Sequence, residues 1–223
     1  MRIAAVIVVA ALAVGAWAEA QPRRHPVSGR VLAPTMSVAG AGWLERPERE
    51  SEEAPSKAIE ALDLKPGMVV ADIGAGSGYY TSRMAQKVGA TGQVYATDIQ
   101  QGMIDIINRR IGVEKLANVT PILSAMDDPA LPKGALDLAI MVDVYHELAA
   151  PQVFLRRLRE SFKPEGRLVL LEYRKEDPRI PILEVHKMSV AEVKVELEAE
   201  GFVIEKVIDT LPWQHIIVLR LKP

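Results

Sequence analysis

Residues 71–80 read ADIGAGSGYY, a run in which one acid is followed by glycines at every second position: Asp72, Gly74, Gly76 and Gly78. The residues just before it, MVVADI at 68–73, are a short apolar run of the kind that forms a buried parallel strand. A helix is predicted to follow over 77–88. Glycines let a backbone approach a ligand closely, and strand-to-helix turns lie at the carboxyl edge of a parallel sheet, where ligands bind. The stretch therefore predicts a ligand-binding loop.

The spacing within this loop indicates the kind of ligand. The dinucleotide fingerprint is GxGxxG, whereas this chain has DxGxGxG. A carboxylate next to a helix N-terminus disfavours a pyrophosphate there. The same carboxylate, Asp72, suits a ligand with a cationic amino-acid end. We therefore expect S-adenosylmethionine, whose methionine part carries an ammonium and a sulfonium.

Two further acidic positions agree with that ligand. Asp98 closes a second predicted strand over 92–98, and an acid at this place can accept hydrogen bonds from both ribose hydroxyls. After a third predicted strand over 119–123, the segment SAMDDPALP offers Asp127 or Asp128 to the adenine amine, and the sequence does not choose between them. The candidate donor-binding residues are Asp72, Gly74, Ala75, Gly76, Gly78, Tyr79, Asp98, Ile99, Met126, Asp127 and Asp143.

The rest of the chain continues the alternation of strands and helices. Apolar runs at 136–142 and 167–172 predict a fourth and a fifth strand, and helices are expected over 101–111, 152–162 and 189–200. Two final strands, 203–208 and 216–221, follow closely on each other. The pattern predicts a doubly wound, Rossmann-like α/β fold over residues 57–223.

These motifs together resemble the class I S-adenosylmethionine-dependent methyltransferases. The resemblance covers about residues 57–221 and rests on VVADIGAGSG, YATDI, MDDPALP, DLAIMVDVYHEL and PEGRLVLLEY. It implies a seven-stranded sheet of order 3-2-1-4-5-7-6 with strand 7 antiparallel. The general pattern is most similar to the small-molecule branch that includes the ubiquinone/menaquinone-type methyltransferases. Membership implies a small-molecule acceptor but does not identify it.

The acceptor is expected beyond strands four and five, where the chain reads DVYHEL from Asp143. We predict Asp143, Tyr145 and His146 as catalytic residues, with His146 as a general base because imidazole titrates near neutrality. The alternative is that His146 caps a segment or bonds a backbone carbonyl. Glu147 and His186 could join His146 around a metal, but nothing in the spacing selects such a site and no metal is predicted. Arg174 or Lys175 could hold an anionic acceptor, or form salt bridges instead.

The amino-acid composition excludes several classes of function. The chain of 223 residues has a net charge of −2, which gives no basic footprint for nucleic acid. It contains no cysteine, which excludes disulfides, thiolate metal sites and a cysteine nucleophile. Oligomeric state is left open. Residues 21–56 are rich in proline and glycine and predict an irregular lead-in, in which Trp43 could shield the donor site and Arg46 or Arg49 could meet a carboxylate.

The first twenty residues have the three parts of a secretory signal: Arg2, an uncharged run over 3–17, and Ala18-Glu19-Ala20. We predict cleavage after Ala20 and a periplasmic or secreted protein. The alternative is an uncleaved inner-membrane anchor, although 15 uncharged residues are short for a bilayer core, which needs about 20. The sequence therefore predicts an exported methyltransferase acting on a small molecule. A catalytically idle binding protein of the same fold is the main alternative, and a dehydrogenase is a weaker one.

Overall fold

The computed structural model describes residues 22–222. The predicted signal peptide over residues 1–20 and its cleavage site lie outside the described residues. Within residues 22–222, no helix has both the length and the apolar character needed to cross a membrane.

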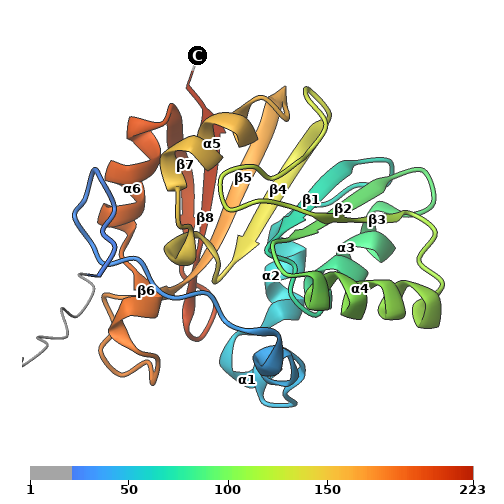
Figure 1. Ribbon diagram of the computed structural model, residues 1–223, viewed down its shortest axis with the longest axis horizontal. Helices are drawn as coiled ribbons and strands as arrows, with labels where there is room; N and C mark the ends of the chain where they lie inside the picture. Colours follow the sequence, from blue (N-terminus) through green and yellow to red (C-terminus); the bar gives the residue numbers. More distant parts are fainter. Residues whose placement is uncertain (1–21, 223) are drawn as a thin grey trace, which may run out of the picture.

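A single twisted sheet forms the centre of the molecule (Figure 1). Its main strands follow the order β3-β2-β1-β4-β5-β8-β7. β8 runs antiparallel to both neighbours, whereas β1 to β5 pair in parallel. The bounds are β1 Val69–Ile73, β2 Gln93–Asp98, β3 Val119–Leu123, β4 Leu136–Val142, β5 Phe162–Arg174, β7 Phe202–Ile208 and β8 Gln214–Leu221. The predicted strand order is confirmed, since β7 and β8 are the sixth and seventh predicted strands.

Two details of the sheet differ from the prediction. A two-residue strand that the sequence did not reveal, β6 (Lys187–Met188), pairs in parallel with the end of β5. Phe162, expected at the end of a helix, instead begins β5. Pairing between β4 and β5 is irregular between Leu136 and Leu138. β5 therefore begins earlier than the predicted strand over 167–172, and the segment at 164–166 bulges within it.

Helices cover both faces of this sheet. β4 shows why, because Leu138 and Ile140 pack into one core and Ala139 and Met141 into the other. One core is closed by α2 (Pro55–Ala61) and α3 (Tyr79–Val88), the other by α5 (Pro151–Arg159) and α6 (Val190–Ala199). α4 (Gln101–Glu114) packs on β2 and β3 beside α3. A capping box between Ser189 and Glu192 begins α6, where the sequence predicts a helix from residue 189.

The lead-in crosses the sheet edge at which β1, β2 and β4 end. We call residues 22–37 the N-terminal arm; it lies beside α6 and is drawn in blue in Figure 1. It continues into a 3₁₀ helix, η1 (Val38–Glu45), and the short α1 (Arg49–Glu52). Arg30 of the arm forms a bidentate ion pair with the fully buried Glu196 of α6. This ion pair attaches the N-terminal arm to α6.

Candidate active site

A cavity of about 550 Å³ opens at the carboxyl edge of the sheet. That volume lies within the range of about 300–1,000 Å³ typical of small-molecule sites. The lead-in forms one wall, and the segments after β1, β2, β3, β4 and β5 form the others. The lining side chains and backbone come from Pro34, Thr35, Met36, Trp43, Leu44, Arg49, Ile73, Gly74, Gly76, Asp98, Ile99, Gln100, Met103, Ser124, Ala125, Met126, Val142, Asp143, Val144, His146, Glu147, Leu148, Phe154, Tyr173, Pro181, Ile182, Leu183 and His186.

The glycine loop after β1 requires glycine for two reasons. Gly74 and Gly76 both have positive φ, +66° and +56°, a region that other residues rarely adopt. A Cβ on Gly74 would lie 2.6 Å from Cγ2 of Val144, and one on Gly76 would lie 2.7 Å from Cδ1 of Leu44. The loop backbone is therefore enclosed by the β4 loop on one side and by η1 on the other.

Asp98 lies where the sequence predicts the ribose of the donor. Its side chain lines the cavity and is 6 % exposed. The carboxylate accepts hydrogen bonds from the backbone N–H of Gly76 (3.1 Å) and of Gln100 (2.9 Å). Burial raises its pKa, which those two backbone donors partly offset. These bonds fix the carboxylate at the wall of the cavity.

Asp72 lies beneath the glycine loop and does not line the cavity. Its carboxylate accepts a hydrogen bond from the Thr81 hydroxyl at 2.6 Å. Burial raises the pKa of Asp72 to about 6, although the Thr81 bond opposes that shift. The structure thus gives Asp72 a place that supports the loop, and not the direct ligand contact that the sequence suggested.

Asp143, at the end of β4, is the carboxylate that faces the cavity near the loop. Its φ is +54°. Gln214 donates to its Oδ2 at 2.7 Å, whereas its Oδ1 is buried and has no hydrogen-bond partner among residues 22–222. Burial and then the neighbouring carboxyls of Glu53 and Glu172 raise the pKa of Asp143 well above its usual range. An unpaired buried acceptor is costly, so a cationic ligand group at this place would be stabilising.

The adenine assignments are not supported. Met126 lines the cavity, together with Ser124 and Ala125. Asp127 and Asp128 do not line it; both approach the Arg157 guanidinium, at 2.9 and 3.4 Å. The carboxylate predicted to meet the adenine amine is therefore occupied elsewhere.

Three other predicted donor-site residues also lie outside the lining. Gly78 caps α3 with φ +78°, and Ala75 is buried in the small core with α4. The ring of Tyr79 is stacked by the guanidinium groups of Arg83 and Arg49, at 3.5 and 4.5 Å. By contrast, Gly74, Gly76 and Ile99 line the cavity as predicted.

His146 stands at the other end of the cavity, in the 3₁₀ turn η2 (Tyr145–Glu147) after β4. Its Nδ1 lies 2.6 Å from Oε2 of Glu172, and its Nε2 lies 3.0 Å from Nδ1 of His186. Burial raises the pKa of Glu147 to about 7. Burial, and then the neighbouring His146, lower the pKa of His186.

Tyr145 is placed differently from the prediction. Its side chain is fully buried in the core between β4, α5 and α6. Its hydroxyl lies 3.4 Å from Nε2 of His25 in the N-terminal arm. Tyr145 therefore does not reach the cavity, because the 3₁₀ turn directs consecutive side chains in different directions. This placement does not agree with the predicted catalytic role of Tyr145.

Glu172 is a buried polar residue for which the sequence predicted no role in the site. It is fully buried and accepts from both the backbone N–H of Tyr145 (2.9 Å) and the ring of His146. A signal for it exists, since the charged Glu172 ends the apolar run RLVLLE on the strand next to β4. A buried charge needs partners, so such a residue points to a polar site.

Two basic candidates for an anionic acceptor lie away from the cavity. Arg174 donates to the backbone carbonyls of Leu211 and Gln214, at 2.7 and 3.1 Å. Lys175 pairs with Glu192 at 2.6 Å. In the lead-in, Arg46 stacks on Trp43, which lines the cavity and is 40 % exposed. The prediction that the lead-in reaches this site therefore agrees with the geometry.

Comparison with known proteins gives a consistent result. A family model described as a methyltransferase domain matches residues 64–216. The ubiquinone/menaquinone biosynthesis C-methyltransferase UbiE of Paraburkholderia phytofirmans is 29% identical over 137 residues, covering 59% of this chain and 54% of that protein. The same enzyme of Burkholderia multivorans is 31% identical over 121 residues, covering 52% and 48%. The chain thus spans about half the length of these relatives.

Solved structures show the same fold. An S-adenosylmethionine-dependent methyltransferase from Aquifex aeolicus superimposes with a TM-score of 0.78 at 28% identity, covering 83% of this chain and 98% of that one. An O-methyltransferase of neocarzinostatin biosynthesis, in complex with S-adenosylhomocysteine and 1,4-dihydroxy-2-naphthoic acid, gives a TM-score of 0.60 at 20% identity, covering 70% and 49%. At that identity the second likeness concerns the fold alone.

Proposed function

We propose that this protein transfers the methyl group of S-adenosylmethionine to a small molecule bound beside His146. The proposal starts from the family, since the chain belongs to the class I S-adenosylmethionine-dependent methyltransferases. The observation that carries the proposal is that one cavity has two chemically different ends. Gly74, Gly76 and Asp98 line one end, and His146 lines the other.

The donor fits the first end on the geometry of this chain. Asp98 would hold the ribose, because its carboxylate is fixed at the cavity wall by two backbone N–H groups. The glycine loop would admit the methionine part, since no Cβ separates its backbone from the ligand. Asp143 would meet the ammonium group through its unpaired Oδ1. The donor supplies an electrophilic methyl group on a sulfonium.

The reaction itself asks mainly for positioning. The bond between sulfur and the methyl carbon breaks, its electron pair stays on sulfur, and the nucleophilic atom of the acceptor bonds to the carbon. A nucleophile that carries a proton must also lose it. Trp43 and Leu44 of η1 would cover the reacting groups and exclude water.

The second end suits a largely apolar acceptor with a polar group. Phe154, Leu148 and Leu183 line the cavity near His146 and Glu147. Aliphatic and aromatic walls with a few polar groups are typical of small-molecule sites. The relatives named as C-methyltransferases of ubiquinone/menaquinone biosynthesis support a small-molecule acceptor.

The donor assignment can be tested by calorimetry with S-adenosylhomocysteine. Asp98→Ala should weaken binding by about 1.5–3 kcal/mol, because charge-assisted hydrogen bonds to the ribose are lost. Asp127→Ala is the matched control. Its carboxylate pairs with Arg157 outside the cavity, so its affinity should change less than about threefold. Equal affinities in wild type and Asp98→Ala would remove the ribose assignment.

Turnover separates an enzyme from an idle binding protein. Formation of S-adenosylhomocysteine should depend on an added acceptor, and a panel of hydroxylated and amino-substituted apolar compounds is the first to try. A chain that binds the donor but turns over with none of them would favour the binding protein.

We also propose that the protein works outside the cytosol. The support is the sequence of residues 1–20, with its basic start, uncharged run and Ala-Glu-Ala ending. N-terminal sequencing of the protein from a bacterial host should begin at Gln21. A soluble cytosolic chain that still starts at Met1 would contradict export.

A further inference from the structure

Three side chains with metal-binding atoms converge at the acceptor end of the cavity. They are His146 and Glu147 of η2 and His186 of η3 (Glu184–His186). Nε2 of His146 lies 3.0 Å from Nδ1 of His186. Oε1 of Glu147 lies 3.9 Å from the first nitrogen and 4.0 Å from the second. All three residues line the cavity.

These separations are close to those of a metal site. Zn²⁺ binds histidine nitrogen and carboxylate oxygen at about 2.0–2.2 Å, usually in tetrahedral geometry. Ligand atoms of such a site are therefore about 3.4 Å apart. The two nitrogens are slightly nearer than this and the oxygen is slightly farther, which small side-chain rotations would correct.

Glu172 prepares His146 for this task. Its carboxylate can only accept, so Nδ1 of His146 carries the proton of the 2.6 Å contact. In the neutral ring, Nε2 then presents a lone pair to the cavity. Glu172 is fully buried and is itself held by the backbone N–H of Tyr145. A carboxylate behind a histidine is the usual outer partner of a metal ligand, fixing its tautomer and orientation.

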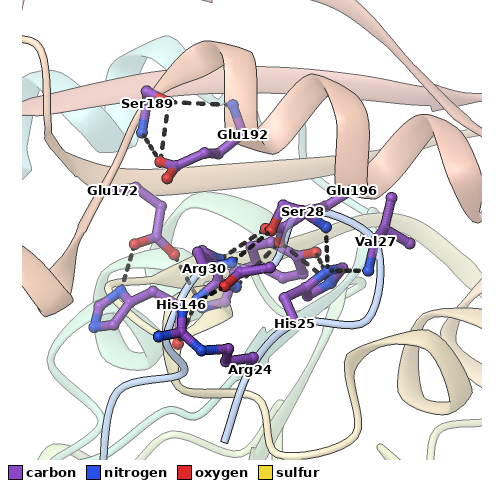
Figure 2. A network of polar contacts seen from close by, with 12 residues as sticks. Arg24, His25, Val27, Ser28, Arg30, His146, Glu172, Ser189, Glu192 and Glu196 are labelled. Atoms are coloured by element: carbon purple, nitrogen blue, oxygen red, sulfur yellow. Dashed lines mark hydrogen bonds and ion pairs between the residues drawn. The ribbon is translucent and has the colours of Figure 1, made fainter. Parts of the chain in front are cut away.

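The N-terminal arm fixes the backbone at the same place. The carbonyl of His146 accepts from Nη1 of Arg30 at 2.9 Å and from the backbone N–H of Ala33 at 3.1 Å. Figure 2 shows Arg30 between His146 and Glu196, and Glu172 in contact with the ring of His146. Both the ring and the backbone of His146 are therefore set before any ligand arrives.

A chain of hydrogen bonds from Glu172 through His146 to His186 is the competing interpretation. It accounts for two of the three contacts, with His186 donating from Nδ1. It gives no role to Glu147, whose Oε1 is too far from either ring for a hydrogen bond. With the proton of His186 on Nε2 instead, all three groups present lone pairs to one another at short range, and a cation between them would stabilise that arrangement.

We propose that His146 Nε2, His186 Nδ1 and Glu147 Oε1 bind one Zn²⁺ ion. Two neutral imidazoles and one carboxylate leave the site with a net charge of +1. Three protein ligands with a fourth position open to a cavity are the arrangement of catalytic zinc, whereas structural zinc has four. The chain has four histidines, and this cluster uses two of them.

The role of the ion rests on the proposed methyl transfer. Its open position faces the acceptor end, so it would hold a hydroxyl or enol oxygen of the acceptor and lower the pKa of that group. The proton leaves to solvent, and the resulting anion supplies the electron pair that bonds to the methyl carbon. The acceptor class is then an apolar molecule with an acidic hydroxyl or enol. His146 cannot serve as the general base in this scheme, because its Nε2 is bound.

Metal binding is measured without any turnover. Chelator-treated full-length or mature protein is titrated with ZnCl₂ by calorimetry and with CoCl₂ by visible absorption. We expect one ion per chain, with micromolar or tighter affinity, and Co²⁺ bands of a four- or five-coordinate site. His186→Ala should weaken binding at least about 100-fold. Glu172→Gln, which changes only the outer partner, should weaken it about 10- to 100-fold.

His215→Ala is the matched control. This histidine also lies between two carboxylates, Asp209 at 2.6 Å and Glu176 at 2.9 Å, but they contact opposite ring nitrogens. It therefore cannot share one ion with both, and its variant should keep the wild-type metal affinity. Thermal unfolding checks that each variant is folded; His186 is partly exposed in a short turn, so its loss should not unfold the chain.

Two outcomes would overturn the site. One is an absence of stoichiometric Zn²⁺ and Co²⁺ binding by the folded wild type. The other is equal affinity in wild type and His186→Ala. Either result leaves the proposed function standing if S-adenosylhomocysteine still binds. Conversely, a chain that binds Zn²⁺ at these residues but not the donor would remove the proposed function and keep the metal site.

Discussion

The donor end and the acceptor end of the cavity draw their contacts from different distances along the chain. At the donor end, Asp98 bonds the backbone of Gly76, 22 positions earlier, and that of Gln100, two positions later. At the acceptor end, His146 bonds Glu172, His186 and Arg30, which are 26, 40 and 116 positions away. The first end is a motif on two adjacent strands, and the second is assembled from four separate segments.

The two ends also differ in the kind of atoms that form their contacts. The donor end uses backbone N–H groups and the absence of side chains at Gly74 and Gly76. The acceptor end uses buried charged side chains, Glu172 and Glu196, that need partners to be tolerated. Changes at the acceptor end should therefore affect stability through broken pairs, and changes at the donor end through steric conflict.

The largest effect is expected where the arm holds the acceptor end. Arg30→Met leaves the fully buried Glu196 without its bidentate partner, which should lower the free energy of unfolding by about 3–5 kcal/mol. Arg156→Met, on α5, is the control. Arg156 also pairs with a buried glutamate, Glu200, but the Arg156 side chain is 62 % exposed. Water can therefore replace it beside Glu200, and the loss should be smaller, about 1 kcal/mol.

Urea unfolding of the two variants measures this difference. Equal losses for Arg30→Met and Arg156→Met would break the comparison, because the acceptor end would then not depend on its long-range buried pair.

A smaller but clear effect is expected at the donor end. In Gly74→Ala the new Cβ would meet Val144 while φ stays at +66°, and the variant should lose about 2–4 kcal/mol of unfolding free energy. Gly134→Ala has a similar φ of +62° and nothing within 4 Å of its Cβ, so it should lose only about 1 kcal/mol.

The pair of glycine variants separates strain from steric conflict. Val144 belongs to the loop that leads to His146, so Gly74→Ala should also weaken the binding of S-adenosylhomocysteine, whereas Gly134→Ala should not. Similar losses in both variants would show that the two loops do not constrain each other.

The smallest effect concerns Asp72, whose pKa burial raises from 3.8 to about 6. Between these values the folded protein holds a proton that the unfolded chain has lost. The free energy of unfolding therefore falls as pH rises from about 4 to 6 and then stays level as far as this group is concerned. Asp72→Asn cannot ionise, so its stability relative to wild type should rise by about 2 kcal/mol from pH 4 to pH 7.

Chemical denaturation at several pH values gives that difference directly. Asp105→Asn, on the exposed side of α4, is the control and should follow the wild-type slope. If Asp72→Asn shows the same slope as well, the carboxylate under the glycine loop is not protonated by burial.

Most of the fold could be predicted because its signals are local. Each signal spans only a few residues: the apolar run at β1, the glycines after it, and the acid that closes β2. Together they indicated the family, and the family resemblance predicted the strand order. β6 was missed because two residues carry no periodicity. The bulge at 164–166 was missed because a proline and a glycine in sequence indicate a turn equally well.

The predicted site residues also fall into two groups, those that line the cavity and those that do not. Gly74, Gly76, Asp98 and Ile99 line the cavity as predicted. Tyr145 and Asp127 do not, since the direction of a side chain in a 3₁₀ turn and the nearness of Arg157 depend on packing. Their sequence neighbours gave no hint of either.

The sequence by itself determined the doubly wound sheet, the donor loop and the family, because hydrophobic period and glycine spacing act over a few residues. Only the tertiary structure decided that Glu172 contacts the ring of His146, that His186 and Glu147 lie beside that ring, and that the arm bonds the backbone carbonyl of His146. Such contacts join segments far apart in the chain. These contacts form only when the whole sheet and its helices pack, and no local sequence pattern indicates which distant segments will meet.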